Sequence, residues 1–198
     1  MEIEDAQLLN AFAGSETDSG EKTRELLTMY NDPKADRMAI FNMMYDQGLL
    51  NESTYDIFLL GERGKKAYRA FFDALFRLEP GRAVLWHCAD GKDRTGCAAM
   101  LLLFALGSSR ETVMEDYLLT NVYNAQKLDA VRQKVAALNF EAKKLDTLMF
   151  VSGGVIKSYM DHAIGTLEER YGSVTGYLKQ ELGIGDPELE ALRAKFLV

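Results

Sequence analysis

The strongest constraint on the fold of this chain is a segment in which two apolar runs flank a polar loop. "AVLWHC", residues 83–88, is a short apolar run of β-forming residues that follows a Pro-Gly pair, and it predicts a buried strand. "CAAMLLLFAL", residues 97–106, is too short to cross a bilayer, so it predicts a buried helix with Gly107 as its C-terminal cap. The polar loop between the two runs is therefore expected at the N-terminus of a buried helix.

That loop, "HCADGKDRTG" at residues 87–96, has the composition of a site for an oxyanion. Backbone N–H groups converge in a loop between a strand and a helix, and the helix N-terminus adds a partial positive charge, so a phosphate group fits there. Gly91 suits the tight turn because it adopts positive φ without a steric penalty. Arg94 offers a planar fork for two phosphate oxygens, and Lys92 adds a second positive charge at the mouth of the pocket.

Cys88 is the candidate nucleophile. A thiol near a helix N-terminus and cationic groups has its pKa lowered to roughly 3.5–7.5, which makes it a thiolate at neutral pH. Thr95 can donate its hydroxyl to that thiolate, and His87 is expected to orient the loop. Phosphoryl transfer to sulfur also requires a proton for the leaving oxygen. The loop carries two carboxylates, Asp90 and Asp93, and Asp93 is the candidate general acid and the later activator of water.

The loop resembles the signature of the cysteine-dependent phosphatases, His-Cys, five residues, then Arg and Thr or Ser. Its Gly-Lys-Asp-Arg-Thr-Gly version is similar to the atypical bacterial tyrosine phosphatases, which also accept phosphoserine, phosphothreonine and phosphoinositides. "DYLLTN", residues 116–121, and "LEERYGSVTGYLKQELGIGDPELEALRAKFL", residues 167–197, resemble the same family. The likeness thus covers roughly residues 80–198, and the loop is its most specific part.

By position, the resemblance implies that Cys88 is the nucleophile and that Arg94 clamps the phosphate and the transition state. It implies that Lys92 and Asp93 are the pair that interacts with the charge of the substrate and acts in acid–base catalysis. It also implies that the phosphate is cradled by the backbone of six residues: Ala89, Asp90, Gly91, Lys92, Asp93 and Arg94. No cofactor is expected, and two histidines and two cysteines at these spacings match no metal pattern.

The fold that the resemblance implies is α/β, tyrosine-phosphatase-like, with a central sheet flanked by helices, rich in helix and short of N-terminal strands. The family's usual Arg-Asp-Leu-Gly-Gly segment does not occur, and residues 1–80 offer one further strand at most, at residues 55–60. Either the chain is truncated at its N-terminus, or another chain supplies strands, or strands escape the pattern. A family acid loop of the Trp-Pro-Asp type is also absent, which leaves the acid role to Asp93, or to Asp129 or Asp161.

We expect a single phosphatase domain at residues 1–198. Residues 1–80 form a variable helical or lid region, and residues 81–198 carry the signature loop and the C-terminal helices. Periodicity predicts an amphipathic helix at residues 64–78 and one long helix at residues 125–145. One apolar stripe is open to two interpretations, as core packing or as a lid over a pocket: Met38, Phe41, Met44 and Tyr45.

The composition excludes some functions. A formal net charge of −7 argues against a general nucleic-acid binder, which would show a basic surface. The chain opens "MEIEDA" and shows no signal peptide and no transmembrane segment, and its two cysteines make no disulfide framework. These features favour a cytoplasmic location, with export by a route without a signal peptide left open, as is the oligomeric state. Cys97 is expected as a buried packing residue, with a redox partnership with Cys88 as the alternative.

The leading hypothesis is phosphomonoester hydrolysis through a phosphocysteine. The expected partner is a phosphoprotein, most readily a phosphotyrosine protein, with phosphoserine, phosphothreonine and phosphoinositides left open. The alternative from another class is a phosphate-recognition or scaffold module without turnover. An arsenate-reductase-like enzyme would need further cysteines to relay a disulfide. A Walker-type nucleotide site is excluded because Lys92 is followed by Asp93 instead of Ser or Thr.

Overall fold

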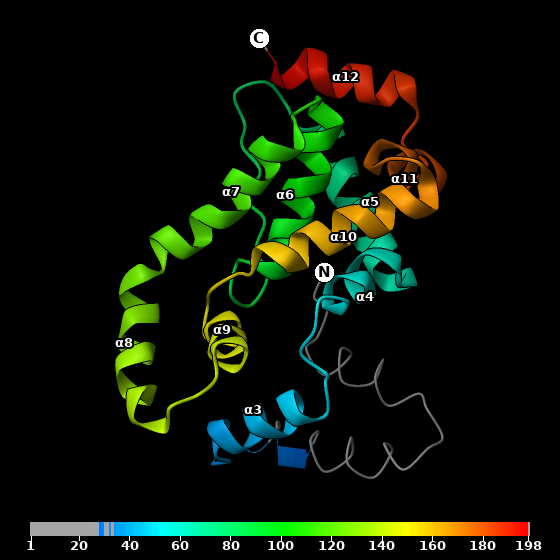
Figure 1. The fold of residues 1–198 in the computed structure, drawn as a ribbon. Coiled ribbons are helices and arrows are strands. Elements are labelled where there is room, and N and C mark those ends of the chain that lie inside the picture. Colours follow the sequence, from blue (N-terminus) through cyan, green and yellow to red (C-terminus); the bar gives the residue numbers. More distant parts are fainter. Residues whose placement is uncertain (1–27, 30–31, 33, 198) are drawn as a thin grey trace.

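A computed structural model of the protein describes residues 28–29, 32 and 34–197. Much of the region expected to be variable, including residues 1–27, lies outside the described residues. The described part is built from helices, and no strand occurs in it (Figure 1). Their bounds are α3 Arg37–Asp46, α4 Thr54–Leu60, α5 Glu62–Arg77, α6 Asp93–Leu106, α7 Arg110–Tyr123, α8 Ala125–Val135, the 3-10 helix η1 Ala136–Leu138, α9 Ala142–Val151, α10 Lys157–Tyr171, α11 Val174–Gln180 and α12 Asp186–Phe196.

The expected central sheet is wrong for the described residues. Residues 83–88 contain no strand hydrogen-bonded to a neighbour, and residues 55–60 lie in α4. The side chains of the apolar run nevertheless alternate between the core and the solvent. Val84 and Trp86 pack against the core, while Leu85 between them is 90% exposed. A strand depends on hydrogen bonds to a neighbouring strand, and its apolar pattern alone cannot supply that neighbour.

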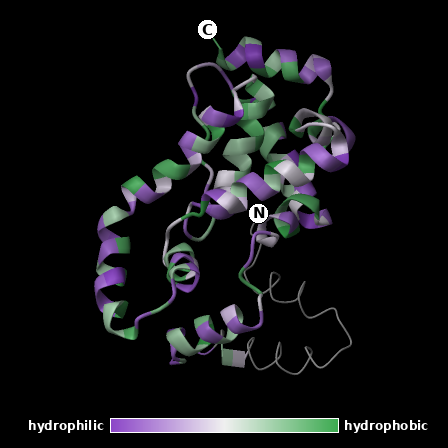
Figure 2. Ribbon diagram, in the orientation of Figure 1, coloured by the Kyte–Doolittle hydropathy of each residue, from purple (hydrophilic) through white to green (hydrophobic). Residues whose placement is uncertain are grey.

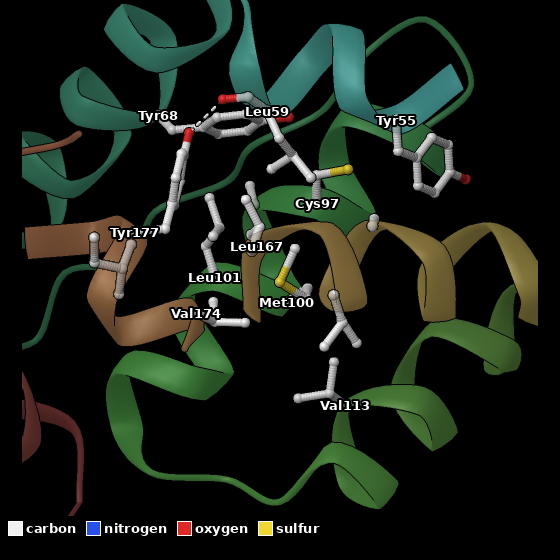
Figure 3. Packing of buried hydrophobic residues seen from close by; sticks show 14 of the residues in the cluster. Tyr55, Leu59, Tyr68, Cys97, Met100, Leu101, Val113, Leu167, Val174 and Tyr177 are labelled. Carbon is white, nitrogen blue, oxygen red and sulfur yellow. Dashed lines mark hydrogen bonds between the residues drawn. The ribbon is translucent and has the colours of Figure 1, made fainter. Parts of the chain in front are cut away.

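The main core surrounds α6, whose apolar run is buried as expected. α4, α7, α11 and α12 contact this helix, and Figure 2 shows that α6 is mostly hydrophobic. Cys97, Leu101 and Ala105 are fully buried in it, and Figure 3 shows Cys97, Met100 and Leu101 among side chains of the surrounding helices. The predicted cap is confirmed, because Gly107 has φ of +94° and its N–H donates to carbonyls in the last turn.

The amphipathic helix predicted at residues 64–78 is confirmed as α5. Its face of Tyr68, Phe72 and Leu75 is buried in the main core. At the ends of α5 and α6, the carbonyl groups receive hydrogen bonds from cationic side chains of α12. Lys195 Nζ lies 2.9 Å from the carbonyl oxygen of Leu75, and Arg193 Nε lies 3.0 Å from that of Ala105. The C-terminal helix therefore closes the core and satisfies helix ends that would otherwise lack partners.

A smaller hydrophobic cluster joins α3, α8 and α9. Its buried members are Phe41, Leu128, Val135, Leu148 and Met149. The single helix expected at residues 125–145 is wrong, because α8 ends at Val135 and the chain turns at Asn139, where φ is +47°. One straight helix over residues 125–145 would be about 30 Å long, whereas α3 is about 15 Å long. The turn lets both halves pack on the same short helix.

Replacing Leu101 with alanine tests the central place of α6. Leu101 is fully buried, so we expect Leu101→Ala to lower the free energy of unfolding by about 2–5 kcal/mol, through lost burial and the cavity left behind. Leu85→Ala is the matched control and should change that free energy by less than about 0.5 kcal/mol, since Leu85 is 90% exposed. Urea denaturation measures both. Equal effects of the two changes would contradict this account of the core.

Candidate active site

The signature loop runs directly into the N-terminus of α6, as the sequence predicted. Gly91 has φ of +67°, a left-handed conformation that glycine adopts without strain. Lys92 occupies the N-cap position, and α6 begins at Asp93. The backbone N–H groups of Gly91, Lys92 and Thr95 approach the sulfur of Cys88 closely enough to lower its pKa. The loop thus brings several donors to one point at the end of a helix.

Cys88 is a partly buried free thiol. Burial alone raises the pKa of this thiol, but nearby donors more than offset it. The donors are the side chain of Thr95, a buried hydroxyl that lies beside the thiol without forming a full hydrogen bond, and the N–H groups of Thr95, Lys92 and Gly91. The net result is a pKa below the usual value for cysteine. The structure therefore favours the thiolate at this position.

Lys92 does not lie at the pocket mouth, where the sequence placed it. Its side chain is only 3% exposed, and its ammonium group pairs with Asp93 at 3.1 Å from Oδ1 and 3.0 Å from Oδ2. The ammonium also lies 4.0 Å from the ring centroid of Phe150 on α9. A buried charge is tolerated where it is paired, and the aromatic face adds a second attraction. Lys92 is thus held inside the protein, beneath the loop.

Asp93 accepts a further hydrogen bond that the sequence did not suggest. The hydroxyl of Tyr55 on α4 lies 2.8 Å from its Oδ1. The same hydroxyl lies 2.8 Å from that of Tyr117 on α7, which lies 3.5 Å from the carbonyl oxygen of Ile156. Tyr55 belongs to the run at residues 55–60 and Tyr117 to the "DYLLTN" segment. Both tyrosines lie far from the loop in the sequence, and no motif there indicates that they contact Asp93 or each other.

The remaining loop residues surround the thiol. Arg94 is partly buried in the first turn of α6, and its Cζ lies 5.8 Å from the ring centroid of Phe58. The exposed ring of His87 donates from Nδ1 to the carbonyl oxygen of Cys88 at 3.1 Å, which ties the ring to the loop backbone. The indole of Trp86 donates to the carbonyl oxygen of Thr95 at 3.3 Å. Ala89 and Asp90 are exposed.

The two alternative acids are engaged elsewhere. Asp161 on α10 pairs with Lys157 and Arg110, and the hydrogen bond from Lys157 is the main cause of a pKa below its usual value. Asp129 on α8 pairs with Arg132 at 3.3 Å. Neither carboxylate has a described contact with the loop, and the acid role of Asp93 stays a prediction.

Cys97 is placed for packing. It is fully buried on α6, and burial raises its pKa far above the usual value for a thiol. The thiol form is therefore favoured, which argues against a redox partnership with Cys88. His162 lies away from the loop and pairs with Asp56, with 3.0 Å between Nε2 and Oδ2.

A cavity of about 860 Å³ adjoins the loop on the side of Lys92. Asp90, Lys92 and Asp93 line one end of it, and the basic side chains of Arg37 and Lys134 also reach it. The rest is mostly apolar and comes from α3, α4, α8, η1, α9 and the turn after α3. Core packing is confirmed for the Met-rich stripe of α3, because Phe41 is buried in the small cluster and Met38 and Tyr45 pack against it. The lid stays a prediction, and the cavity wall includes Met38, Phe41 and Met44.

Two further observations concern the whole described part of the chain. In the part of the chain that the structure describes, no three histidine, cysteine or acidic side chains gather as they would around a metal ion. None of the described helices combines the length and hydrophobicity needed to cross a membrane.

Comparison with known proteins identifies the family to which the chain belongs. Residues 8–198 match the family described as the tyrosine phosphatase family. A Cupriavidus necator protein provisionally named a tyrosine-protein phosphatase is 34% identical over 131 residues, which cover 66% of this chain and 45% of that protein. The triple specificity protein phosphatase PtpB of Mycobacterium tuberculosis is 32% identical over 139 residues, covering 66% of this chain and 50% of that protein. The chain spans about half the length of these relatives.

Alkylation of the folded protein with iodoacetamide tests the state of the two thiols. We expect Cys88 to react at a pH below that of an ordinary cysteine, because its pKa is lowered, and Cys97 to remain unlabelled. Thr95→Val removes the hydroxyl beside the thiol that helps to lower its pKa, so the pH midpoint of labelling should move upward. Mass spectrometry of the labelled peptides gives both rates.

The control for that change is Thr166→Val, which removes a hydroxyl that lies beside His162 and away from the loop. Its labelling midpoint should equal that of the wild type. A Cys88 midpoint at the ordinary cysteine value, or one unmoved by Thr95→Val, would contradict the assigned donors.

Proposed function

Because the chain belongs to the tyrosine phosphatase family, we propose that it hydrolyses phosphate monoesters through a phosphocysteine intermediate on Cys88. The observation that carries the proposal is the lowered pKa of Cys88, whose sulfur faces donors at the start of α6. We further propose that residues 1–198 act as one phosphatase domain, which the family match over residues 8–198 supports.

In the first step, the Cys88 thiolate attacks phosphorus. A P–S bond forms as the P–O bond to the leaving group breaks, and Asp93 gives its proton to the leaving oxygen. The N–H groups of residues 89–94 and the guanidinium of Arg94 bind the phosphoryl oxygens, whose charge they stabilise in the transition state.

In the second step, water attacks the phosphorus of the phosphocysteine. Asp93, now a carboxylate, takes a proton from the water as the new P–O bond forms and the P–S bond breaks. Inorganic phosphate leaves, and Cys88 returns to the thiolate. Lys92 acts through Asp93 in this scheme, although it also lies in the wall of the cavity. Its buried ammonium holds Asp93 and adds positive charge beneath the loop.

Phosphotyrosine is the substrate we propose first. The cavity beside the loop has aromatic walls from Phe58 and Phe150, which suit an aryl ring whose phosphate occupies the loop. The basic side chain of Lys134, which also lines the cavity, offers a partner for an acidic group near the phosphorylated residue. The name of the Mycobacterium tuberculosis relative, a triple specificity phosphatase, supports a wider range, and phosphoserine, phosphothreonine and phosphoinositides remain within the proposal.

A phosphate-recognition module without turnover is the competing function. Such a module needs the N–H groups of the loop and Arg94, but it has no use for a thiolate. The lowered pKa of Cys88 therefore favours the enzyme. A thiolate nucleophile also needs a reducing compartment, so we propose that the protein works in the cytoplasm on phosphorylated proteins.

Hydrolysis of an aryl phosphate with chelator and reductant tests the enzyme directly. We expect wild-type protein to release phosphate at mildly acidic pH, and the chelator to have no effect because the nucleophile is sulfur. Cys88→Ser should reduce turnover to background while vanadate still binds. Vanadate binding without turnover in the folded wild type would instead support the recognition module.

Arg94→Lys separates a planar clamp from a simple positive charge. Lysine keeps the charge but loses the fork that binds two oxygens, so kcat/KM should fall by about 10²- to 10³-fold. The matched control is Arg132→Lys, an exposed arginine paired with Asp129 on α8, which should keep wild-type kinetics. Steady-state kinetics with 4-nitrophenyl phosphate measures both. A loss under about threefold for Arg94→Lys would argue that charge alone is sufficient.

A further inference from the structure

We propose that Tyr55 is a positioning residue for the reaction, which fixes the Asp93 carboxyl group through a hydrogen bond and is itself supported by Tyr117. This inference rests on the proposed function of the loop. Tyr55 does not touch the phosphate in this account. It acts through Asp93, and its hydroxyl determines which carboxyl oxygen exchanges the proton.

The hydrogen bonds define that oxygen. Oδ1 of Asp93 receives hydrogen bonds from the Tyr55 hydroxyl at 2.8 Å and the Lys92 ammonium at 3.1 Å, whereas Oδ2 lies 3.0 Å from that ammonium as an ion pair and receives no hydrogen bond from the residues that the structure describes. A carboxyl oxygen accepts about two hydrogen bonds, so Oδ1 is occupied and Oδ2 keeps one position for a proton. The proton delivered to the leaving group therefore travels on Oδ2.

The number of available protons also determines which group donates in the hydrogen bonds that join Tyr117, Tyr55 and Asp93. An ionised carboxylate only accepts, so the single hydroxyl proton of Tyr55 points to Asp93. The oxygen of Tyr55 can then accept the single hydroxyl proton of Tyr117, because Tyr117 lies 2.8 Å from Tyr55 but 3.5 Å from its other acceptor, the carbonyl oxygen of Ile156. Tyr55 is fully buried, and burial, followed by the nearby charge of Asp93, raises its pKa well above the usual value. It remains a donor throughout the working pH range.

Rigid packing fixes the donor in place. The Tyr55 ring makes edge contacts with Tyr117 and Tyr159, with centroids 6.2 and 6.1 Å away. It also packs against Phe150, at 6.3 Å, the ring that lies against the Lys92 ammonium. One aromatic cluster therefore locates both donors to Asp93. In Figure 3, Tyr55 projects from α4 at the edge of the core that lies away from Tyr177.

The last glycine of the loop motif contributes to this arrangement. A Cβ at Gly96 would lie 3.4 Å from Cδ2 of Tyr117, so the ring packs directly on the backbone of α6. Gly96 lies one turn along the helix from Asp93, and its N–H donates to the carbonyl oxygen of Lys92. The packing of Tyr117 against the first turns of α6 is therefore part of what holds its hydroxyl beside Tyr55.

The test compares two substrates that differ in their need for a proton. Phenyl phosphate has a basic leaving group, whereas 4-nitrophenyl phosphate has a leaving group that departs readily without protonation. We expect Tyr55→Phe to lower kcat/KM for phenyl phosphate by about 10-fold, and to lower it clearly less for 4-nitrophenyl phosphate. kcat/KM is the useful quantity because it reports the steps up to phosphocysteine formation, even where a later step limits kcat.

A double-mutant cycle shows whether Tyr55 acts through Asp93. Asp93→Asn should lower kcat/KM for phenyl phosphate by about 10²-fold or more, and adding Tyr55→Phe should cause no further loss. Tyr159→Phe is the matched control, because it removes a hydroxyl from a neighbouring ring that has no described hydrogen bond to Asp93, and it should keep wild-type values. If Tyr55→Phe does not fold, Tyr117→Phe should show the same substrate dependence with a smaller loss.

The outcomes separate the two proposals. Equal losses with both substrates, or losses that multiply in the double mutant, would show that Tyr55 only supports the fold, and would overturn this inference alone. No turnover of either substrate by folded wild-type protein would overturn the proposed function, and the role of Tyr55 with it.

Discussion

The hydrogen bonds that converge on Cys88 exist because α6 begins inside the protein. This helix is the centre of the main core, so its first turn is held from several sides and its N–H groups keep a fixed direction. Four of the features described above depend on that position: the lowered pKa of Cys88, the left-handed turn at Gly91, the burial of Lys92 and the contact between Asp93 and Tyr55. The same helix therefore forms the centre of the core and places the donors that lower the pKa of Cys88.

The features that the sequence predicted correctly are those that neighbouring residues determine. The helix at residues 64–78, the cap at Gly107 and the loop before α6 each depend on short spacings or on a single backbone conformation. The sheet was wrong because a strand needs a partner from elsewhere in the chain, and the alternation of residues 83–88 is satisfied by packing Val84 and Trp86 alone. Contacts with Tyr55 and Phe150 escaped prediction for the same reason, since they join the loop to distant segments.

Lys92 is a charged residue of the loop whose side chain is buried in the protein. Removing an ammonium group from water is costly, and a lysine this deeply buried needs partners that replace its hydration. Asp93 supplies the opposite charge and Phe150 supplies an aromatic face. The loop therefore carries a buried ion pair between two adjacent residues at the start of α6. A lysine at the surface would have been screened by water and held less firmly.

α9 connects two parts of the molecule that otherwise pack separately. Leu148 and Met149 belong to the small cluster with α3 and α8, and the next residue, Phe150, belongs to the main core and contacts Lys92. Adjacent residues of α9 therefore pack into the small cluster and into the main core. The packing of the small cluster and the position of the ring beside the Lys92 ammonium therefore depend on the same turn of α9.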